Sequence, residues 1–430
     1  MTSRGSADQF GKGLVANGAG HGEMPSAAMP LAEIDPSHPD LFATGTWREI
    51  FARLRAEAPV LRVESGPYGP YWSVAGYDPV VQVSSRPEIF SSSFERGGFT
   101  IQDMASDAEA SVPMFIALDG EAHAHQRRSV APAFAPSAMA ALESDVRRRT
   151  GELLDRLPRD EEFDWVDSVS IELTTGMLAI LFDFPWDDRR KLTFWSDWMG
   201  DTGAATDGAW REQRGRILFE AASYFGKLWA ERKGKGAADL ISMMAESDVL
   251  ADADQRQILG NMMLLIVGGN DTTRNSMSGA VDFMTEFPQQ REALEGDGDL
   301  VANAVSETIR KQSPLPHMRR TAIEDAELGG QAIRAGDKVV LWHISANHDE
   351  SIFPDAENWD LGRENSRRHI AFGHGVHRCV GARLAELQLR ILFEELRERR
   401  LRPVRVGEPR RIASNFLHGI QRMRVRLERY

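Results

Sequence analysis

The chain has 430 residues, of which 42% are hydrophobic, a formal net charge of −13 and a single cysteine. A net negative charge argues against a nucleic-acid-binding protein, because phosphate partners require a basic face, and one cysteine excludes an internal disulfide and fits a reducing, cytoplasmic compartment. No apolar run reaches the ~20 residues of a membrane span, and residues 1–30 are small, polar and glycine-rich, so we expect a soluble protein with a mobile N-terminal tail.

Hydrophobic periodicity predicts the elements that follow the tail. Residues 46–59 have helical spacing, and residues 60–80 alternate around Gly-Pro turns, which predicts a helix and then a two-stranded hairpin. A second strand-rich region covers 319–345. Long helical patterns occupy 137–157, 167–182, 210–233, 253–287 and 381–400. With no repeat and no linker between two cores, the sequence predicts a mainly α fold: one large unit, residues 31–430, with a small β-rich region drawn from both ends.

The only cysteine, Cys379, lies in the segment HIAFGHGVHRCVGARLA, residues 369–385. Its histidines, His369, His374 and His377, raise the possibility of a zinc site, but their spacing fits no common zinc pattern. A reactive or inert buried thiol is a second interpretation. A haem-thiolate site is the third, and it explains more residues, because glycines let a flat macrocycle approach the backbone and a following helix N-terminus favours a thiolate.

The same segment carries a family resemblance. Its residues 372–381 reproduce the pattern F-G-x-G-x-H-x-C-x-G of the haem-binding loop of the cytochrome P450 monooxygenases, and the resemblance extends from about residue 40 to the end of the chain. It implies the cytochrome P450 fold, haem b as cofactor and Cys379 as the axial iron ligand. It further implies haem contacts from Phe372, Gly373 and Gly381, and propionate contacts from His123, Arg127, Arg320 and His377.

Two adjacent glycines, Gly268 and Gly269, interrupt the most apolar helical pattern. Each costs ~1 kcal/mol relative to alanine inside a helix, so we expect either close packing against another helix or a groove for dioxygen. The segment Gly-Gly-Asn-Asp-Thr resembles the family signature A/G-G-x-D/E-T. The resemblance implies that Asp271 and Thr272 supply the acid and the hydroxyl of a proton relay.

Glu307 and Arg310 are three residues apart on one predicted helix. As a surface pair they would contribute only ~0.2–0.5 kcal/mol. Together they resemble the E-x-x-R helix of the family, and Arg363 matches the arginine that completes this buried triad. We therefore expect these three residues to support folding and haem retention.

The resemblance implies a substrate pocket lined by apolar residues, so we expect a hydrophobic substrate. The residues expected to line this pocket are Leu264, Val267, Gly268, Leu315, Met318 and Phe416. The phrases LIVGGNDTTRNSMSG and SNFLHG resemble the bacterial alkane terminal hydroxylases (the CYP153 branch), which implies terminal hydroxylation of a medium-chain n-alkane or fatty chain. Related branches act on terpenes, branched lipids and steroid side chains. A non-catalytic haem protein that binds a hydrophobic ligand is the alternative from a different class.

Charge is unevenly distributed. Residues 363–430 contain seventeen arginines, seven glutamates and no aspartate, a net charge of +10, so the preceding residues carry −23. We expect electrons to come from a separate [2Fe–2S] ferredoxin and its reductase, docked near Arg127, Arg128, Arg378 and Arg383. The alternative is that these arginines pair with acidic residues of the same chain.

Overall fold

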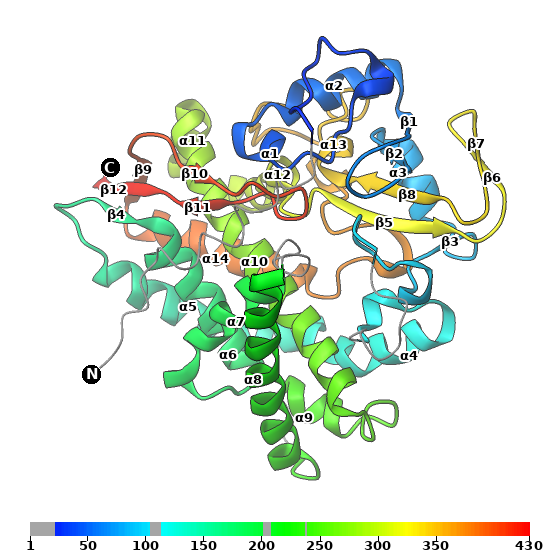
Figure 1. The fold of residues 1–430 in the computed structure, drawn as a ribbon. Coiled ribbons are helices and arrows are strands. Elements are labelled where there is room, and N and C mark those ends of the chain that lie inside the picture. The colour runs from blue at the N-terminus through cyan, green and yellow to red at the C-terminus, as the bar shows by residue number, and fades with distance from the viewer. Residues whose placement is uncertain (1–21, 104–112, 201–207, 237–238) are drawn as a thin grey trace.

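The computed structural model describes residues 22–103, 113–200, 208–236 and 239–430. Helices form most of the molecule, and a smaller region with strands β1, β2, β5 and β8 lies beside them (Figure 1). The prediction of a mainly α fold with a small β-rich region is confirmed. None of the described helices is long and apolar enough to cross a membrane.

The helices are α1 Asp40–Thr44, α2 Trp47–Glu57, α3 Tyr77–Ser84, α4 Gly120–Val130, α5 Pro136–Arg156, α6 Glu172–Leu181, α7 Arg190–Gly200, α8 Gly208–Arg232, α9 Leu240–Ala245, α10 Gln255–Glu286, α11 Pro288–Gly296, α12 Val301–Gln312, α13 His343–Ala346 and α14 Ala382–Glu398. The strands are β1 Val60–Val63, β2 Tyr71–Val74, β3 Phe90–Ser91, β4 Phe163–Asp164, β5 His317–Ala322, β6 Ala326–Leu328, β7 Gln331–Ile333, β8 Lys338–Trp342, β9 Leu401–Arg405, β10 Arg410–Arg411, β11 Ile420–Arg422 and β12 Arg424–Arg429.

The largest sheet has five strands in the order β1-β2-β8-β5-β3. The hairpin predicted from sequence is present, because β1 and β2 pair antiparallel from Val60↔Val74 to Val63↔Tyr71. Strand β8 pairs parallel with β2 and antiparallel with β5. The sheet therefore joins segments more than 200 residues apart in the sequence.

The predicted hairpin extends too far at its C-terminal end. Strand β2 ends at Val74, and Tyr77–Ser84 forms helix α3. The N–H of Tyr77 donates to Asp349 Oδ2 at 2.9 Å, which satisfies an amide that has no partner within the helix. This cap comes from a residue far along the chain, so the local pattern could not reveal it.

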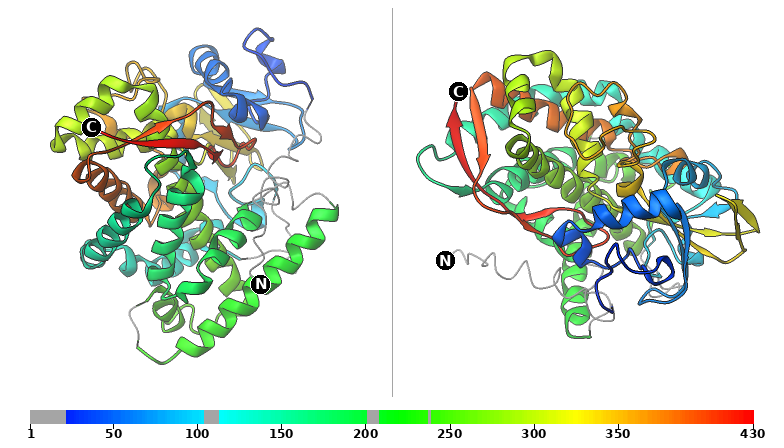
Figure 2. Two further views of the ribbon diagram at one scale, coloured as in Figure 1. Left: turned by 90° about the vertical axis from the view of Figure 1, so that its left-hand side faces the viewer. Right: turned by 90° about the horizontal axis from the view of Figure 1, so that it is seen from above.

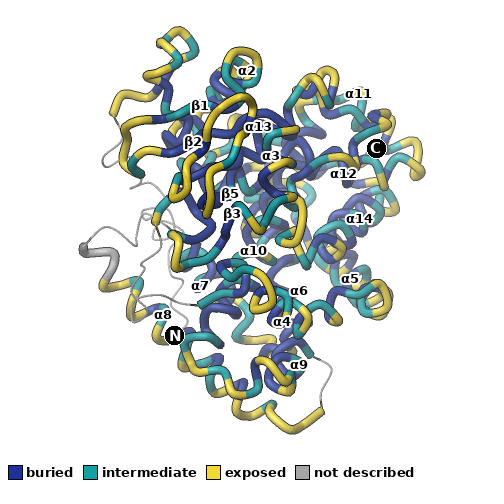
Figure 3. The backbone as a smooth tube through the Cα atoms, turned by 90° about the vertical axis from the view of Figure 1, so that its right-hand side faces the viewer, coloured by how far each residue is buried: buried dark blue, intermediate teal, exposed yellow. Residues whose placement is uncertain are grey.

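Helix α10 runs through the centre of the molecule, where the backbone is mostly buried (Figure 3). It packs against α6, α7, α8, α12 and α14. Between Asn270 and Asp282 many of its buried side chains are polar. The sequence predicted this helix within two residues of its observed ends.

The expected N-terminal tail is described only in part. Residues 1–21 lie outside the described residues. Ala27 and Met29 pack against the cluster of buried residues around α2, and the guanidinium of Arg53 donates to the carbonyl oxygens of both. The chain is therefore attached to the helix α2 region before residue 30.

Most C-terminal arginines are paired within the chain. Strands β9 and β12 lie along one side of the molecule (Figure 2). There Arg405 Nε and Arg411 Nη2 lie 3.0 and 2.7 Å from the two carboxylate oxygens of the buried Asp282, and Arg426 Nη2 lies 3.0 Å from Glu162 Oε1. For these residues the alternative of internal pairing holds.

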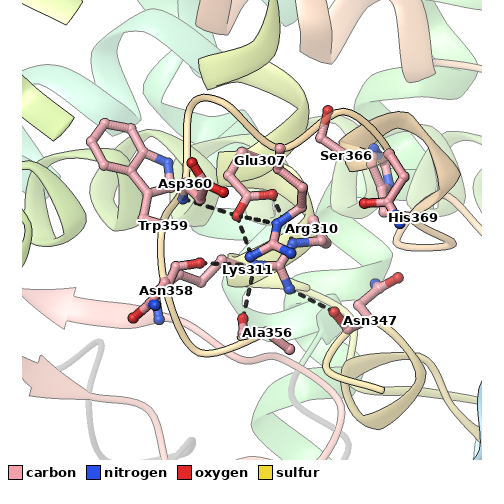
Figure 4. Close-up of polar contacts among 12 residues, drawn as sticks. Glu307, Arg310, Lys311, Asn347, Ala356, Asn358, Trp359, Asp360, Ser366 and His369 are labelled. Atoms are coloured by element: carbon pink, nitrogen blue, oxygen red, sulfur yellow. Dashed lines mark hydrogen bonds and ion pairs between the residues drawn. The ribbon is translucent and has the colours of Figure 1, made fainter. Parts of the chain in front are cut away.

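Glu307, Arg310 and Arg363 form a buried ion triad (Figure 4 shows the first two). Arg310 Nε and Nη2 both donate to the Glu307 carboxylate at 2.8 Å, and Arg363 Nε donates to Glu307 Oε1 at 3.0 Å. Arg310 Nη1 also donates to the carbonyl of Asn347 at 2.7 Å. Charges that are this deeply buried are stable only when each is paired.

We predict that Glu307→Ala destabilises the folded protein by about 3–5 kcal/mol, because it leaves two guanidinium groups buried without their carboxylate. Urea unfolding followed by tryptophan fluorescence measures the loss. Glu231→Ala, which removes the exposed partner of Lys227, is the control and should leave the midpoint unchanged. Equal midpoints for the two variants would contradict a structural role for the triad.

Candidate functional site

Cys379 lies just before α14, at the end of a loop that is shaped by short hydrogen bonds. Its N–H donates to the Phe372 carbonyl at 2.8 Å, and the N–H of Gly373 donates to the Ile370 carbonyl at 2.8 Å. Gly375 has a φ of +71°, and a Cβ there would lie 2.1 Å from the carbonyl oxygen of Ser84. Glycine is therefore required at 375, where the loop packs directly on the end of α3.

The loop faces a cavity of about 350 Å³. Helix α10 lines the cavity with Gly268 and Thr272, while the loop contributes Phe372, Gly373 and Cys379. Cys379 retains exposed area, on the side of the residue that lines the cavity. Burial raises the pKa of its thiol, against the lowering influence of the Gly381 N–H and of Arg127 and Arg378. A metal cation on the sulfur would favour the thiolate instead.

Basic side chains gather at the same cavity. His123 and Arg127 come from α4, Arg320 from β5 and His377 from the loop, and all four line the cavity. The imidazole rings of His123 and His377 lie 4.2 Å apart, centroid to centroid. Burial, assisted by Arg127 for His123 and by Arg320 for His377, lowers the pKa of both. Both histidines are therefore neutral hydrogen-bonding groups near pH 7.

The two arginines of this group have no carboxylate within ion-pair distance among the described residues. Arg320 is 7% exposed. Its Nη1 donates only to the carbonyl of Arg319, and burial lowers its pKa to about 10. Nδ1 of His377 is likewise buried without a hydrogen-bond partner. A buried arginine without a carboxylate partner, with a half-buried arginine beside the same cavity, calls for an anionic occupant, and the two propionates of a haem held by Cys379 fit this requirement.

The two glycines of α10 have different roles. A Cβ at Gly269 would lie 2.9 Å from Leu178 Cδ2 of α6, whereas a Cβ at Gly268 would meet nothing within 4 Å. Close packing therefore explains Gly269, and open space at the cavity explains Gly268. Thr272 also faces this space, and its Oγ1 donates to the carbonyl of Gly268 at 2.6 Å.

Asp271 lies behind this surface and is fully buried. Its Oδ1 lies 3.1 Å from Arg274 Nη2, which also contacts Asp197 Oδ1 at 2.8 Å. Its Oδ2 has no hydrogen-bond partner and faces Gly200, whose Cβ, if present, would lie 3.2 Å away. Burial raises the pKa of Asp271 to about 6, although the positive charge of Arg274 lowers it.

All six residues expected in the substrate pocket line the cavity: Leu264, Val267, Gly268, Leu315, Met318 and Phe416. The lining also includes side chains that the sequence analysis did not name individually: Phe99, Thr100, Met114, Phe115, Ile116, Leu178, Leu181, Met199 and Met263.

The zinc interpretation finds no ligand set in the part of the chain that the structure describes, because no group of three or more His, Cys, Asp or Glu side chains there could hold a metal ion. His369 is instead used locally. Its Nδ1 accepts the N–H of Ala371 at 3.3 Å, and its ring packs 5.5 Å from that of Phe372.

The exposed arginines around the loop behave differently from the C-terminal ones. Arg128, Arg367, Arg368, Arg378 and Arg383 are exposed, and none forms an ion pair with a carboxylate in the described ranges. Arg127 Nη2 donates to the Arg378 carbonyl at 2.6 Å, which brings the end of α4 against the cysteine loop. The surface on the cysteine side is therefore basic.

Comparisons with known proteins agree with one another. Residues 220–420 match the family "Cytochrome P450". Linalool 8-monooxygenase of Pseudomonas putida is 37% identical over 91% of this chain and 98% of its own length. Methyl-branched lipid omega-hydroxylase of Mycobacterium bovis is 33% identical over 93% and 96%. The structure of cytochrome P450-153 from Novosphingobium aromaticivorans is 53% identical, covers 92% of this chain and 99% of that one, and superposes with a TM-score of 0.88.

A pH-dependent stability should follow from Asp271. Its pKa is higher in the folded chain than the about 3.9 of an unfolded aspartate, so its contribution to stability is fully present below about pH 4 and is lost as the pH rises to about 6. Asp271→Asn removes this contribution. We predict that the wild-type holoprotein loses on the order of 1–3 kcal/mol relative to the variant over this range, measured from urea midpoints at stepped pH. Urea midpoints that change with pH in the same way in wild type and Asp271→Asn would contradict the raised pKa of Asp271.

Proposed function

The chain belongs to the cytochrome P450 family, and from that premise we propose that it hydroxylates the terminal carbon of a medium-chain n-alkane or similar fatty chain. Its activity as a monooxygenase and its haem b with a cysteine thiolate ligand follow from the family. The observation that carries the substrate proposal is the apolar cavity that opens onto Cys379. The 53% identity to cytochrome P450-153 and the alkane-hydroxylase phrases of the sequence support the same branch.

The residues present fit the cofactor. Cys379 would supply the axial sulfur, with Phe372, Gly373 and Gly381 beside it. Arg127 and Arg320 would pair with the propionates, and His123 and His377 would add hydrogen bonds. When bound, the haem supplies dioxygen reduction, in which one oxygen atom enters a C–H bond, the other leaves as water, and two electrons and two protons are consumed.

Thr272 and Asp271 are the groups that we assign to proton delivery. The Thr272 hydroxyl lies at the cavity surface, where its Oγ1 donates to the Gly268 carbonyl at 2.6 Å and from where it would pass a proton into the cavity. Asp271, with a pKa of about 6, is protonated in part near neutral pH, which suits a general acid. Asp271 contacts Arg274, which contacts Asp197, and neither of these two residues lines the cavity.

Terminal oxidation requires orientation. A primary C–H bond is stronger than a secondary one, so the chain must be held end-on for the terminal carbon to react first. Leu264 and Val267 on α10 and Phe416 on the C-terminal loop are apolar walls that exclude water from the chain. No charged group is needed for an alkane, and burial of its methylenes supplies the binding free energy.

We further propose that an acidic [2Fe–2S] ferredoxin, reduced by its reductase, docks on the basic surface formed by Arg128, Arg367, Arg368, Arg378 and Arg383. Because these arginines have no ion-pair partner among the described carboxylates, they remain available for complementary charges. With a single cysteine, the enzyme fits the reducing cytoplasm, where such partners occur.

A second candidate is a terpene, branched-lipid or steroid side-chain hydroxylase. The 37% identity over 91% of the chain to linalool 8-monooxygenase favours a terpene. The cavity chemistry serves both candidates, since terpenes and alkanes are apolar and lack charge. Cavity shape decides between them.

The substrate proposal is tested by titrating the purified holoprotein with n-alkanes of graded length while following the Soret band. We expect a saturable shift that is strongest at one chain length. Leu264→Trp, which narrows the cavity, should move that optimum to shorter chains, and Ile323→Trp at an exposed position should not. A spectrum that no alkane shifts but linalool does would contradict the alkane proposal and favour the terpene alternative.

The docking proposal is tested by neutralising Arg128 and Arg383 together. We expect Arg128→Gln/Arg383→Gln to slow reduction by ferredoxin at low salt and to flatten its salt dependence. Arg424→Gln/Arg426→Gln removes two exposed arginines of β12 and serves as the matched control. Stopped-flow reduction rates that stay unchanged in the first pair would contradict docking at this surface.

A further inference from the structure

His317 lies where three segments of the cavity wall meet. Its Nε2 accepts the N–H of Ile101 at 3.1 Å, and its Nδ1 contacts the carbonyl oxygen of Asn415 at 2.8 Å. Each partner adjoins a lining residue, because Thr100 precedes Ile101 and Phe416 follows Asn415. Leu315, two residues before His317, and Met318, directly after it, also line the cavity, yet the side chain of His317 itself is fully buried and does not line it.

Only one form of the imidazole makes both contacts. A carbonyl can only accept, so Nδ1 carries the hydrogen, and the amide of Ile101 can only donate, so Nε2 offers its lone pair. The ring is therefore the neutral Nδ1–H tautomer. Burial supports this form, because it lowers the pKa of His317 to about 4 even though the Asn415 carbonyl raises it.

The histidine is itself held firmly. It is the first residue of β5 and is paired with Trp342 of β8 in the five-stranded sheet. Its ring packs edge-on against Trp342, at 5.2 Å between centroids, and against Phe416 at 5.8 Å. Asn415 is fixed on its other side as well, since its Nδ2 donates to the Ser37 carbonyl at 2.7 Å.

We propose that His317 is a positioning residue that determines which carbon of a bound chain is oxidised, by tying the walls at Thr100 and Phe416 to the central sheet. This inference rests on the proposed oxidation of an apolar chain. An apolar wall contacts such a substrate without hydrogen bonds, so the position of the wall alone fixes where the chain ends. A small displacement of either segment then changes which carbon is presented.

The fold does not depend on His317 alone. The N–H of Arg319 donates to the Phe99 carbonyl at 2.8 Å, so the same segment is attached to β5 at a second point. His317→Phe keeps an aromatic ring against Trp342 and Phe416 but removes both hydrogen bonds. We therefore expect the variant to fold, with one end of the segment released.

The test measures amide hydrogen exchange and product distribution. In His317→Phe we expect exchange at the Ile101 amide to rise at least about tenfold, while the Arg319 amide, which keeps its acceptor, is unchanged. The ratio of terminal to internal hydroxylation should fall several-fold at equal haem content. His317→Gln, whose amide can donate to Asn415 and accept from Ile101, should restore both readouts in part.

His348→Phe is the matched control, because His348 is equally buried but bonds only the Ile344 carbonyl four residues away. Unchanged exchange at the Ile101 amide in His317→Phe would contradict the proposal that His317 holds this segment. A raised exchange rate with an unchanged product ratio would contradict the role of His317 in selectivity. The ratio is scored on whichever substrate the wild-type enzyme oxidises, so failure of the alkane proposal leaves this test intact. If His317→Phe does not fold, exchange at the Ile101 amide and the product ratio are compared between His317→Gln and wild type instead.

Discussion

The buried carboxylate of Glu307 is the interaction on which the site depends. Arg310 and Arg363 bind this carboxylate from different parts of the chain, and Arg310 also donates a hydrogen bond to the carbonyl of Asn347. Asn347 in turn accepts the N–H of Ile370 on its Oδ1 at 2.7 Å, at the start of the cysteine loop. A single charge in α12 is thus connected by hydrogen bonds to the loop that presents Cys379. Because burial penalises any unpaired member, the loop has one favoured position.

Features that depend on neighbouring residues were predictable from the sequence. The cysteine loop is a local pattern, and the periodicity of α5, α8, α10 and α14 placed these helices within two residues of their observed ends. Contacts between distant residues were not predictable. The cap that Asp349 provides for α3 and the bridge from His317 to Ile101 and Asn415 join residues far apart in sequence, and no periodic pattern records such a contact.

The charge distribution was likewise predictable from the sequence only in part. Counting arginines identified a basic C-terminal region, but the count could not tell paired from unpaired side chains. The structure separates them, since Arg405 and Arg411 share Asp282 whereas Arg378 and Arg383 face solvent. The cavity lining includes Arg127 and Arg320, which have no carboxylate partner among the described residues, together with many hydrocarbon side chains. One cavity thus combines cationic and apolar side chains, which suits a carboxylate-bearing macrocycle together with an apolar substrate.

The unequal surroundings of Gly268 and Gly269 have a consequence for how this enzyme can diversify. A methyl group at position 268 would enter open cavity, whereas one at position 269 would lie 2.9 Å from Leu178 Cδ2 and would require that side chain of α6 to move. Position 268 should therefore tolerate a larger side chain better than position 269. Substrate range can be retuned at the first position by single steps that leave the scaffold intact, and purifying selection should hold the second. Directed evolution of a narrower binding site would begin at residue 268.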